Sequence, residues 1–364
     1  MADVTGPRVV LVLNSGSSSL KYAAFDIARA EARAIVDGQV DAGDGAAAFA
    51  AIDAALAEAG VPAPVAVGHR IVHGGPKLVR HCVVDDAVIR ELDEAEPFAP
   101  LHVPAALALL RAATARYPDA VQVACFDTAF YADMPDIART LPIPRAMWAE
   151  GIHRYGFHGL SCESVVHQLG EDVPGRLVVA HLGNGASVTA VRDGRSIDTS
   201  MGLTPTGGVM MGSRTGDIDP GVLIHLMRTR GCGADAIEAI VDRDAGMRGV
   251  SGLSGDMRVL HAAPGEDAAL AIAMFCRSVA KQIAGMMTAL GGADAIVFTG
   301  GIGEHDADVR RRICADLAWA GVVLPGEGAG GSQHGCVVRV CPSDEEAQIA
   351  RHVKVLIPAA RDAA

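Results

Sequence analysis

Short runs of apolar, mostly β-branched residues alternate along this chain with longer stretches that favour helix. The apolar runs cover residues 9–13, 65–72, 121–126, 177–181 and 296–298, and the helical stretches cover residues 46–59, 104–116 and 308–319. Alternation of this kind is typical of folds in which helices pack against a sheet that contains parallel strands. We therefore predict an α/β protein.

Two predicted helices carry chemical signals at their start. Asp219 and Pro220 have the order expected of an N-cap followed by proline in the first helical position. Ser343 and Glu346 have the spacing of a capping box in front of a helix over residues 347–353.

A weak internal repeat indicates two related domains. Residues 10–21 and 178–189 each contain an apolar strand, a turn of small residues and a second strand with alternating polarity. Both segments predict a β-hairpin, and they lie about half a chain apart. The economical interpretation is a pair of related domains with a cleft between them, in which the chain crosses over somewhere within residues 128–154.

Length, charge and cysteine content narrow the function classes. With 364 residues, the chain is long enough for two domains. Its 31 Lys and Arg against 43 Asp and Glu give a formal charge of −12, which argues against a nucleic-acid partner. The eight cysteines contain no C-x-x-C pair, which suits reduced thiols rather than disulfides or zinc.

The same reading places the protein in the cytoplasm and away from membranes. An acidic residue stands near the N-terminus where a signal peptide needs basic ones. The most apolar long stretch, residues 270–290, is interrupted by Arg277, Lys281 and Gln282, so it predicts a buried core helix rather than a membrane span.

Three glycine-rich turns have the composition of phosphate-binding loops. The first spans residues 16–19 and is followed by Lys21, the second is residues 183–185, and the third is residues 299–304. Small residues let backbone N–H groups approach an anion, and serine hydroxyls add donors. An ordinary tight connection explains any one of these turns equally well, but three together favour a nucleotide.

Other motifs for nucleotide binding, hydrolysis or metal binding are absent or lack the expected context. No lysine follows a glycine, so there is no Walker loop, and neither G-x-S-x-G nor H-E-x-x-H occurs. Residues 326–331 match G-x-G-x-x-G, but a predicted strand at 336–340 follows them where a dinucleotide site needs a helix, so we interpret the match as chance. His69 and His73 lie four apart on a strand-like segment, a spacing that does not create a metal-binding face there.

Four side chains are candidates for phosphoryl-transfer chemistry. Arg70 and Arg214 each stand near glycines, and a planar guanidinium matches carboxylate and phosphate oxygens. Asp127 ends a predicted strand, where open α/β sheets bind ligands, and His158 lies in an aromatic, glycine-framed stretch. The alternatives are structural salt bridges for the arginines, a helix N-cap for Asp127 and a core histidine for His158.

With these motifs in place, the chain resembles the acetate kinase family. Asn14-x-Gly16-Ser17-Ser18-Ser19-x-Lys21 and His181-x-Gly183-x-Gly185-x-Ser187 match that family's two signatures, and further matching blocks extend the resemblance from residue 9 to about 351. The resemblance implies an α/β fold of two duplicated ribonuclease-H-like domains, as in the acetate and sugar kinase and actin superfamily, with a nucleotide cleft between them. Residues 1–150 with about 346–364 would form an N-terminal acyl-substrate domain, and residues 151–345 a nucleotide-binding domain.

The resemblance also implies a reaction: Mg²⁺-dependent, reversible phosphorylation of acetate by ATP to give acetyl phosphate, in a homodimer. Asp127, His158 and Arg214 would be catalytic, and Asn14 and Glu345 would lie at the metal. Arg70 would hold the acetate carboxylate, and Val72, Leu101 and Pro205 would line the methyl pocket. The nucleotide and its phosphates would be bound by Lys21, His181, Leu182, Gly183, Asn184, Gly185, Asp256, Met257, Arg258, Gly301, Ile302, Gly303, Glu304 and His305.

The sequence departs from the family pattern at several positions, including Val103, Ala106, Leu160, Cys162 and His305. These departures concern the acyl pocket, the nucleotide preference and the subunit contacts. Two alternatives therefore stay open: a propionate or other short-chain acyl kinase, since one methylene gives only about 1–3 kcal/mol of discrimination, and a nucleotide-binding superfamily member without catalysis.

Overall fold

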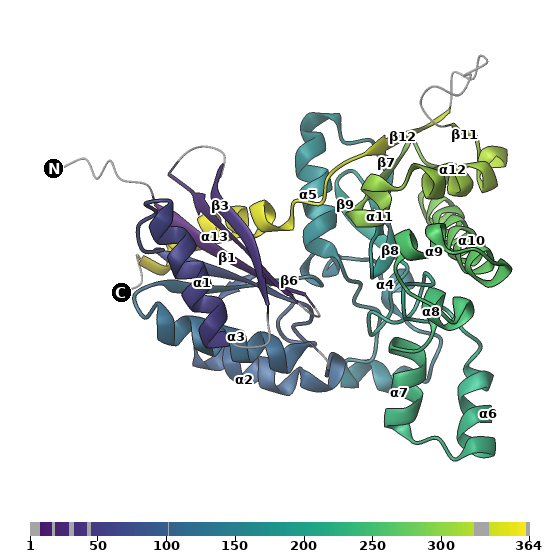
Figure 1. Cartoon of the computed structure of the whole chain (residues 1–364), viewed down its shortest axis with the longest axis horizontal. Coiled ribbons are helices and arrows are strands. Elements are labelled where there is room, and N and C mark those ends of the chain that lie inside the picture. Colours follow the sequence, from purple (N-terminus) through teal and green to yellow (C-terminus); the bar gives the residue numbers. More distant parts are fainter. Residues whose placement is uncertain are drawn as a thin grey trace. The chain divides into compact units, whose positions relative to one another are not determined.

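A computed structural model describes residues 8–16, 19–28, 33–41, 45–100, 102–323 and 335–361 (Figure 1). The chain divides into two compact units: unit 1 contains Met1–Ala132 and Asp344–Ala364, and unit 2 contains Asp133–Ser343. The domain boundary near residue 150 stays a prediction; the compact units change over after Ala132 and again before Asp344.

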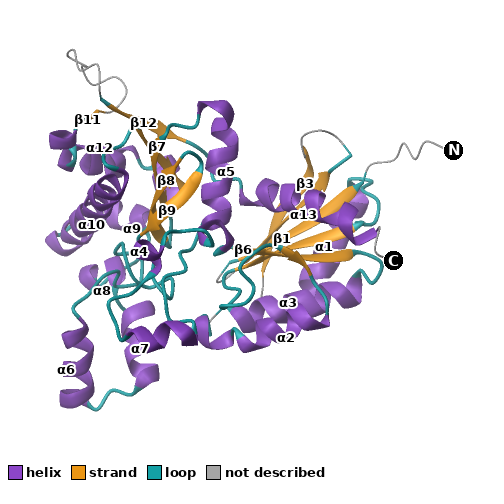
Figure 2. Ribbon diagram, turned by 180° about the vertical axis from the view of Figure 1, so that it is seen from behind, coloured by secondary structure: helices purple, strands orange, loops and turns teal. Residues whose placement is uncertain are grey.

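Unit 1 is built on a six-stranded mixed sheet in the order β3-β2-β1-β4-β6-β5 (Figure 2). Strands β1 to β3 form an antiparallel meander, β4 and β6 continue it in parallel with β1, and β5 closes the edge antiparallel to β6. The strand bounds are β1 Val9–Ser15, β2 Ser19–Asp26, β3 Arg33–Asp41, β4 Ala66–Ile71, β5 Cys82–Val83 and β6 Val121–Phe126.

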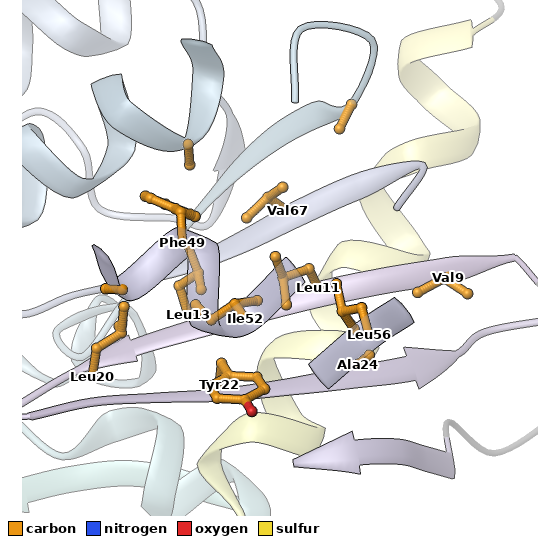
Figure 3. Close-up of a cluster of buried hydrophobic side chains, with 13 residues drawn as sticks. Val9, Leu11, Leu13, Leu20, Tyr22, Ala24, Phe49, Ile52, Leu56 and Val67 are labelled. Carbon is orange, nitrogen blue, oxygen red and sulfur yellow. The ribbon is translucent and has the colours of Figure 1, made fainter. Parts of the chain in front are cut away.

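Helices cover both faces of this sheet. A cluster of buried side chains joins β1 and β2 to helix α1, with Leu11, Tyr22, Phe49 and Ile52 at its centre (Figure 3). On the other face, helix α13 lies so close to β4 that a Cβ on Gly68 would come within 2.6 Å of Ile349, so only glycine fits there. The helix bounds are α1 Gly45–Glu58, α2 Asp86–Glu94, α3 Val103–Arg116 and α13 Glu345–Arg361.

Unit 2 repeats this architecture. Its sheet has the order β11-β12-β10-β7-β8-β9, in which β7 to β9 are an antiparallel meander and β10 and β12 run parallel to β7. Counted from the meander edge, the order β9-β8-β7-β10-β12 corresponds to β3-β2-β1-β4-β6 of unit 1. The bounds are β7 Arg176–Leu182, β8 Ala186–Arg192, β9 Arg195–Thr199, β10 Ala295–Thr299, β11 Val322–Val323 and β12 Cys336–Val340.

Helix α10 packs on β7, β8 and β9, and α5 lies on the opposite side of the sheet (Figure 1). By length and composition α10 is the one described helix that could cross a membrane, but half of its most apolar window is buried in unit 2, as the sequence predicted for a core helix. The helix bounds are α4 Asp136–Arg139, α5 Gly159–Leu169, α6 Pro220–Arg230, α7 Ala234–Asp242, α8 Gly246–Ser251, α9 Met257–Ala262, α10 Glu266–Leu290, α11 Gly300–His305 and α12 Ala307–Asp316.

Local predictions fared unequally. Both hairpins of the repeat are present, and Asp219 caps α6 by accepting from Gly221 N at 2.8 Å. The capping box at Ser343 is wrong, because α13 begins at Glu345 and Asp344 Oδ1 accepts from Ala347 N. The Ser343 hydroxyl instead donates to Ser161 Oγ.

None of the eight cysteines forms a disulfide in the described structure. Burial raises the pKa of Cys82 to about 11 and of Cys276 to about 12. Because the thiolate is the reactive form, neither side chain is suited to nucleophilic chemistry at neutral pH.

Candidate active site

In unit 1, three predicted site residues meet at one edge of the sheet. Asn14 lies near the end of β1, Arg70 near the end of β4 and Asp127 directly after β6. These three strands are mutually parallel neighbours, so their carboxyl ends lie together, at the edge where open α/β sheets bind ligands.

The Arg70 guanidinium binds the Asp127 carboxylate through its Nε and Nη2 atoms. Arg70 Nε donates to both carboxylate oxygens at 3.1 Å, and Nη2 donates to Oδ2 at 2.6 Å. The Asp127 side chain is fully buried and that of Arg70 is 16% exposed. Burial by itself lowers the pKa of Arg70, but the charges of Asp127 and Glu345 outweigh it and raise the pKa above the ordinary value. Arg70 is therefore a fixed positive charge.

A group of oxygen-bearing side chains adjoins this pair. Asn14 Oδ1 accepts from Arg70 Nη1 at 3.3 Å, while Asn14 Nδ2 donates to Glu345 at 3.0 Å and to Glu346 at 2.8 Å. With Asp127, three carboxylates surround one guanidinium, which leaves a net negative charge. Hard oxygen donors of this kind are those that Mg²⁺ prefers, so the residues fit a magnesium ion.

The other predicted residues of unit 1 make no side-chain hydrogen bond to this cluster within the described structure, or lie outside the described residues. Lys21 is exposed on β2, opposite Asn14 in the strand register, and lines a cavity of about 940 Å³ with Glu346 and Arg351. Val72 is half-buried just after β4. Leu101, like Ser17 and Ser18 of the first turn, lies outside the described residues.

In unit 2, His158 and Arg214 both approach the second glycine turn. A Cβ built on Gly185 would lie 3.2 Å from His158 Nε2 and 3.6 Å from Arg214 Nη1, so glycine keeps this space open. His158 is buried and lies at φ 60°, the left-handed region that non-glycine residues rarely adopt. Its ring stacks on His181, with the ring centroids 4.2 Å apart.

The loop that carries Arg214 is pinned at its base. Asp217 accepts from Gly208 N at 2.7 Å and from Gln282 of α10 at 2.9 Å, and Ser278 of the same helix accepts from Met210 N. Arg214 Nη1 donates to Pro205 O at 3.2 Å, which places the half-buried Pro205 beside the guanidinium. The arginine therefore stands on a supported loop rather than on a free one.

A cavity of about 1090 Å³ opens beside the same turn. Eight of the residues that the sequence assigned to the nucleotide line it: Gly183, Asn184, Asp256, Met257, Arg258, Gly301, Ile302 and His305. His181, Leu182, Gly185, Gly303 and Glu304 do not line it. Glu304 accepts from Gly300 N at 3.0 Å and Ser343 N at 2.8 Å, so its carboxylate secures the strand-to-helix connection.

Sequence reasoning missed part of the cavity wall and one carboxylate. The additional lining residues are Gly212, Ser213, Arg248, Gly255, His261, Asp306, Ala307 and Asp308. The glycine-dense loop around Arg214 was a signal for the first two, whereas His261, whose Nε2 lies 2.8 Å from Asp306 Oδ2, stands in no motif. Glu346 was interpreted as a helix cap, and its contact with Asn14 follows only from the fold.

Comparison with known proteins shows which family the chain belongs to. Residues 63–351 match the Acetokinase family. The chain is 43% identical over 304 residues to the acetate kinase of Methylocella silvestris, covering 80% of this chain and 75% of that protein. It is 42% identical over 381 residues to the acetate kinase of Micrococcus luteus, covering 94% and 98%.

Solved structures agree. Porphyromonas gingivalis acetate kinase superposes with a TM-score of 0.84 at 33% identity, covering 96% of this chain and 99% of that one. A propionate kinase from Francisella tularensis gives 0.85 at 34% identity with the same coverage. The repeated sheets are therefore the α/β fold of the acetate and sugar kinase and actin superfamily, as the sequence predicted. The family match, the similar sequences and the similar structures all agree with the residues found at the carboxyl edge of the unit 1 sheet. The chain therefore belongs to the acetokinase family.

Proposed function

We propose that this protein catalyses the reversible, Mg²⁺-dependent transfer of the terminal phosphoryl group of ATP to acetate, giving ADP and acetyl phosphate. The observation that carries the proposal is the approach of His158 Nε2 and Arg214 Nη1 to Gly185, beside a cavity large enough for a nucleotide. The acetate kinases among its relatives support the acceptor. In this proposal the reaction uses residues of both units.

The chemical difficulty is the meeting of two anions. Acetate is already ionised at neutral pH, so no strong base is needed and the barrier lies in bringing a carboxylate to a phosphate. In unit 1, Asp127 accepts from Nε and Nη2 of Arg70, and Asn14 accepts from Nη1. Nη1 and Nη2 each carry a second N–H, and this pair of donors would hold the acetate carboxylate. Asp127 then orients Arg70 and balances its charge instead of removing a proton.

In unit 2, positive and hydrogen-bonding groups receive the phosphates. Arg214 supplies charge to the transferring phosphoryl group, a contribution worth about 10³–10⁵ in rate in other phosphoryl-transfer enzymes. His158 supplies a second group beside it, and the turn at Gly183–Gly185 lets phosphate oxygens come near the backbone.

Asn14 and Glu345 would hold Mg²⁺, with Glu346 beside them. A bound ion would supply positive charge to neutralise the phosphates. The amide of Asn14 is positioned for this by its contacts to Arg70 and both glutamates.

Val72, Leu101 and Pro205 would surround the acetate methyl group. The protein is also proposed to act in the cytoplasm as a homodimer, without nucleic-acid or membrane partners.

The test is production of an acyl phosphate. Purified protein is mixed with ATP, Mg²⁺ and acetate, propionate or butyrate in turn, and hydroxylamine traps any acyl phosphate as a hydroxamate, which added Fe³⁺ makes visible. We expect acetate to give the highest kcat/KM. A higher value for propionate would move the protein to the alternative substrate, and nucleotide binding without hydroxamate would refute the kinase proposal.

A further inference from the structure

Two buried serines contact the two stacked histidines of unit 2. Ser187 Oγ lies 2.9 Å from His158 Nδ1, and Ser161 Oγ lies 2.8 Å from His181 Nδ1. The two serines are 1% and 0% exposed. Each serine hydroxyl therefore hydrogen-bonds Nδ1 of its histidine, the ring nitrogen other than Nε2.

The contacts cross between helix α5 and the hairpin of β7 and β8. His158 occupies the N-cap position of α5 and Ser161 lies in the first turn of that helix, whereas His181 on β7 and Ser187 on β8 are paired in the strand register. The helix histidine contacts the strand serine, and the strand histidine contacts the helix serine. Neither ring can turn without losing a contact to the other element.

Ring orientation follows from this arrangement. With Nδ1 held by a hydroxyl, Nε2 of His158 faces Gly185 and Nε2 of His181 lies 3.9 Å from a Cβ built on Gly183. A hydroxyl donates to a neutral Nδ1 and accepts from a protonated one, so it holds the ring in either protonation state. The strained backbone of His158 requires such support from its surroundings.

We propose that Ser161 and Ser187 are positioning residues for phosphoryl transfer: together they fix His181 and His158 so that both Nε2 atoms face the phosphate turn. This inference rests on the proposed function, because it takes the turn at Gly183–Gly185 as the place of the transferring group. Ser343, whose hydroxyl donates to Ser161 Oγ at 3.2 Å, extends the support of the His181 side.

The first experiment is steady-state kinetics of Ser187→Ala and Ser161→Ala by the hydroxamate assay. We expect kcat to fall about 10- to 100-fold, as for residues that orient a catalytic group, with KM for ATP and acetate changed less than threefold. Ser187→Thr, which keeps the hydroxyl, should restore most of kcat. Ser196→Ala is the matched control, because Ser196 Oγ is buried in the same sheet with no hydrogen-bond partner in the described structure.

A double-mutant cycle tests whether Ser187 acts through His158. In a His158→Asn background, Ser187→Ala should cause less than a twofold further loss, since the ring it orients is gone. Independent, multiplying losses would overturn the proposal. So would kcat values of both serine variants within twofold of the Ser196→Ala control.

A readout without catalysis separates this inference from the proposed function. In protein labelled with ¹⁵N-histidine, Ser187→Ala should shift the Nδ1 resonance of one imidazole, assigned as the one missing from His158→Asn. An unchanged resonance contradicts the contact. If wild-type protein forms no hydroxamate, the proposed function and the assigned role fail together, and the resonance shift still decides the contact. If Ser187→Ala does not fold, Ser161→Ala and its own resonance, assigned with His181→Asn, decide instead.

Discussion

Replacing Arg70 by methionine should destabilise unit 1 through the carboxylate that it leaves behind. Arg70 donates to Asp127 from both Nε and Nη2, and the Asp127 side chain is fully buried. Methionine fills much of the volume without supplying a donor. Removing one partner of a buried ion pair costs about 3–5 kcal/mol, because the other charge stays in a medium that solvates it poorly.

The loss of stability has to be measured with a probe located in unit 1. Both tryptophans, Trp148 and Trp319, belong to unit 2, so their fluorescence does not report on the sheet that carries Arg70. Hydrogen exchange of peptides from β1, β4 and β6 reports on it directly. A loss of 3–5 kcal/mol corresponds to exchange about 10²- to 5 × 10³-fold faster in the slowest amides.

The double variant Arg70→Met/Asp127→Asn identifies the cause. Removing the buried charge should recover most of the protection, although activity stays low because the proposed acetate ligand is gone. Arg116→Met is the control, since the exposed pair of Arg116 with Asp53 in the same unit is worth at most about 1 kcal/mol. If the double variant exchanges as fast as Arg70→Met alone, an uncompensated Asp127 is not what destabilises the unit.

The remaining predictions concern unit 2 and a buried histidine. Arg214→Leu should lower kcat at least a hundredfold while tryptophan fluorescence stays native; near-normal turnover would refute its role. Asp217→Ala, which frees Gly208 N at the base of the Arg214 loop, should lower kcat about tenfold, whereas Asp217→Asn keeps an acceptor oxygen and most activity; equal losses in the two variants would count against a positioning effect. Burial lowers the pKa of His69 from 6.5 to about 4, so between these pH values the unfolded chain binds a proton that the folded one does not. The free energy of unfolding should therefore fall by about 3 kcal/mol as the pH decreases from 6.5 to about 4. Urea unfolding at a series of pH values should show a smaller fall for His69→Gln than for the wild type. An equal fall in both proteins would contradict the role of His69.

Much of the fold was predictable because its signals are local. The apolar run at residues 9–13 predicts a strand, and it is continuous because β1 is buried on both faces of the sheet. The turn of small residues and the second strand after it predict the hairpin. The same grammar at residues 178–189 predicted the second hairpin, and the shared strand order of the two sheets confirms that the repeat is structural.

Predictions failed where two local signals competed for one segment. Ser343 and Glu346 satisfy a capping box, but Asp344 is also a good cap and lies one residue nearer the helix. Residues 299–304 were predicted as a glycine-rich turn, yet Gly300–His305 form the short helix α11, whose carbonyls at Gly303 and Glu304 accept from Arg310. Contacts distant in the sequence hold Ser343, whose hydroxyl donates to Ser161 Oγ and whose N–H donates to Glu304.

The residue types of the candidate site were set by the sequence, because arginine, aspartate and histidine next to glycine turns already restrict the chemistry to anions. Their partners were not. Arg70 lies on β4 and Asp127 directly follows β6, and only parallel pairing of these strands brings the two side chains together. The crossed contacts of Ser161 and Ser187 likewise depend on how α5 meets β7 and β8. Composition and periodicity fix what each segment becomes, whereas contacts between distant segments exist only once the sheet has assembled.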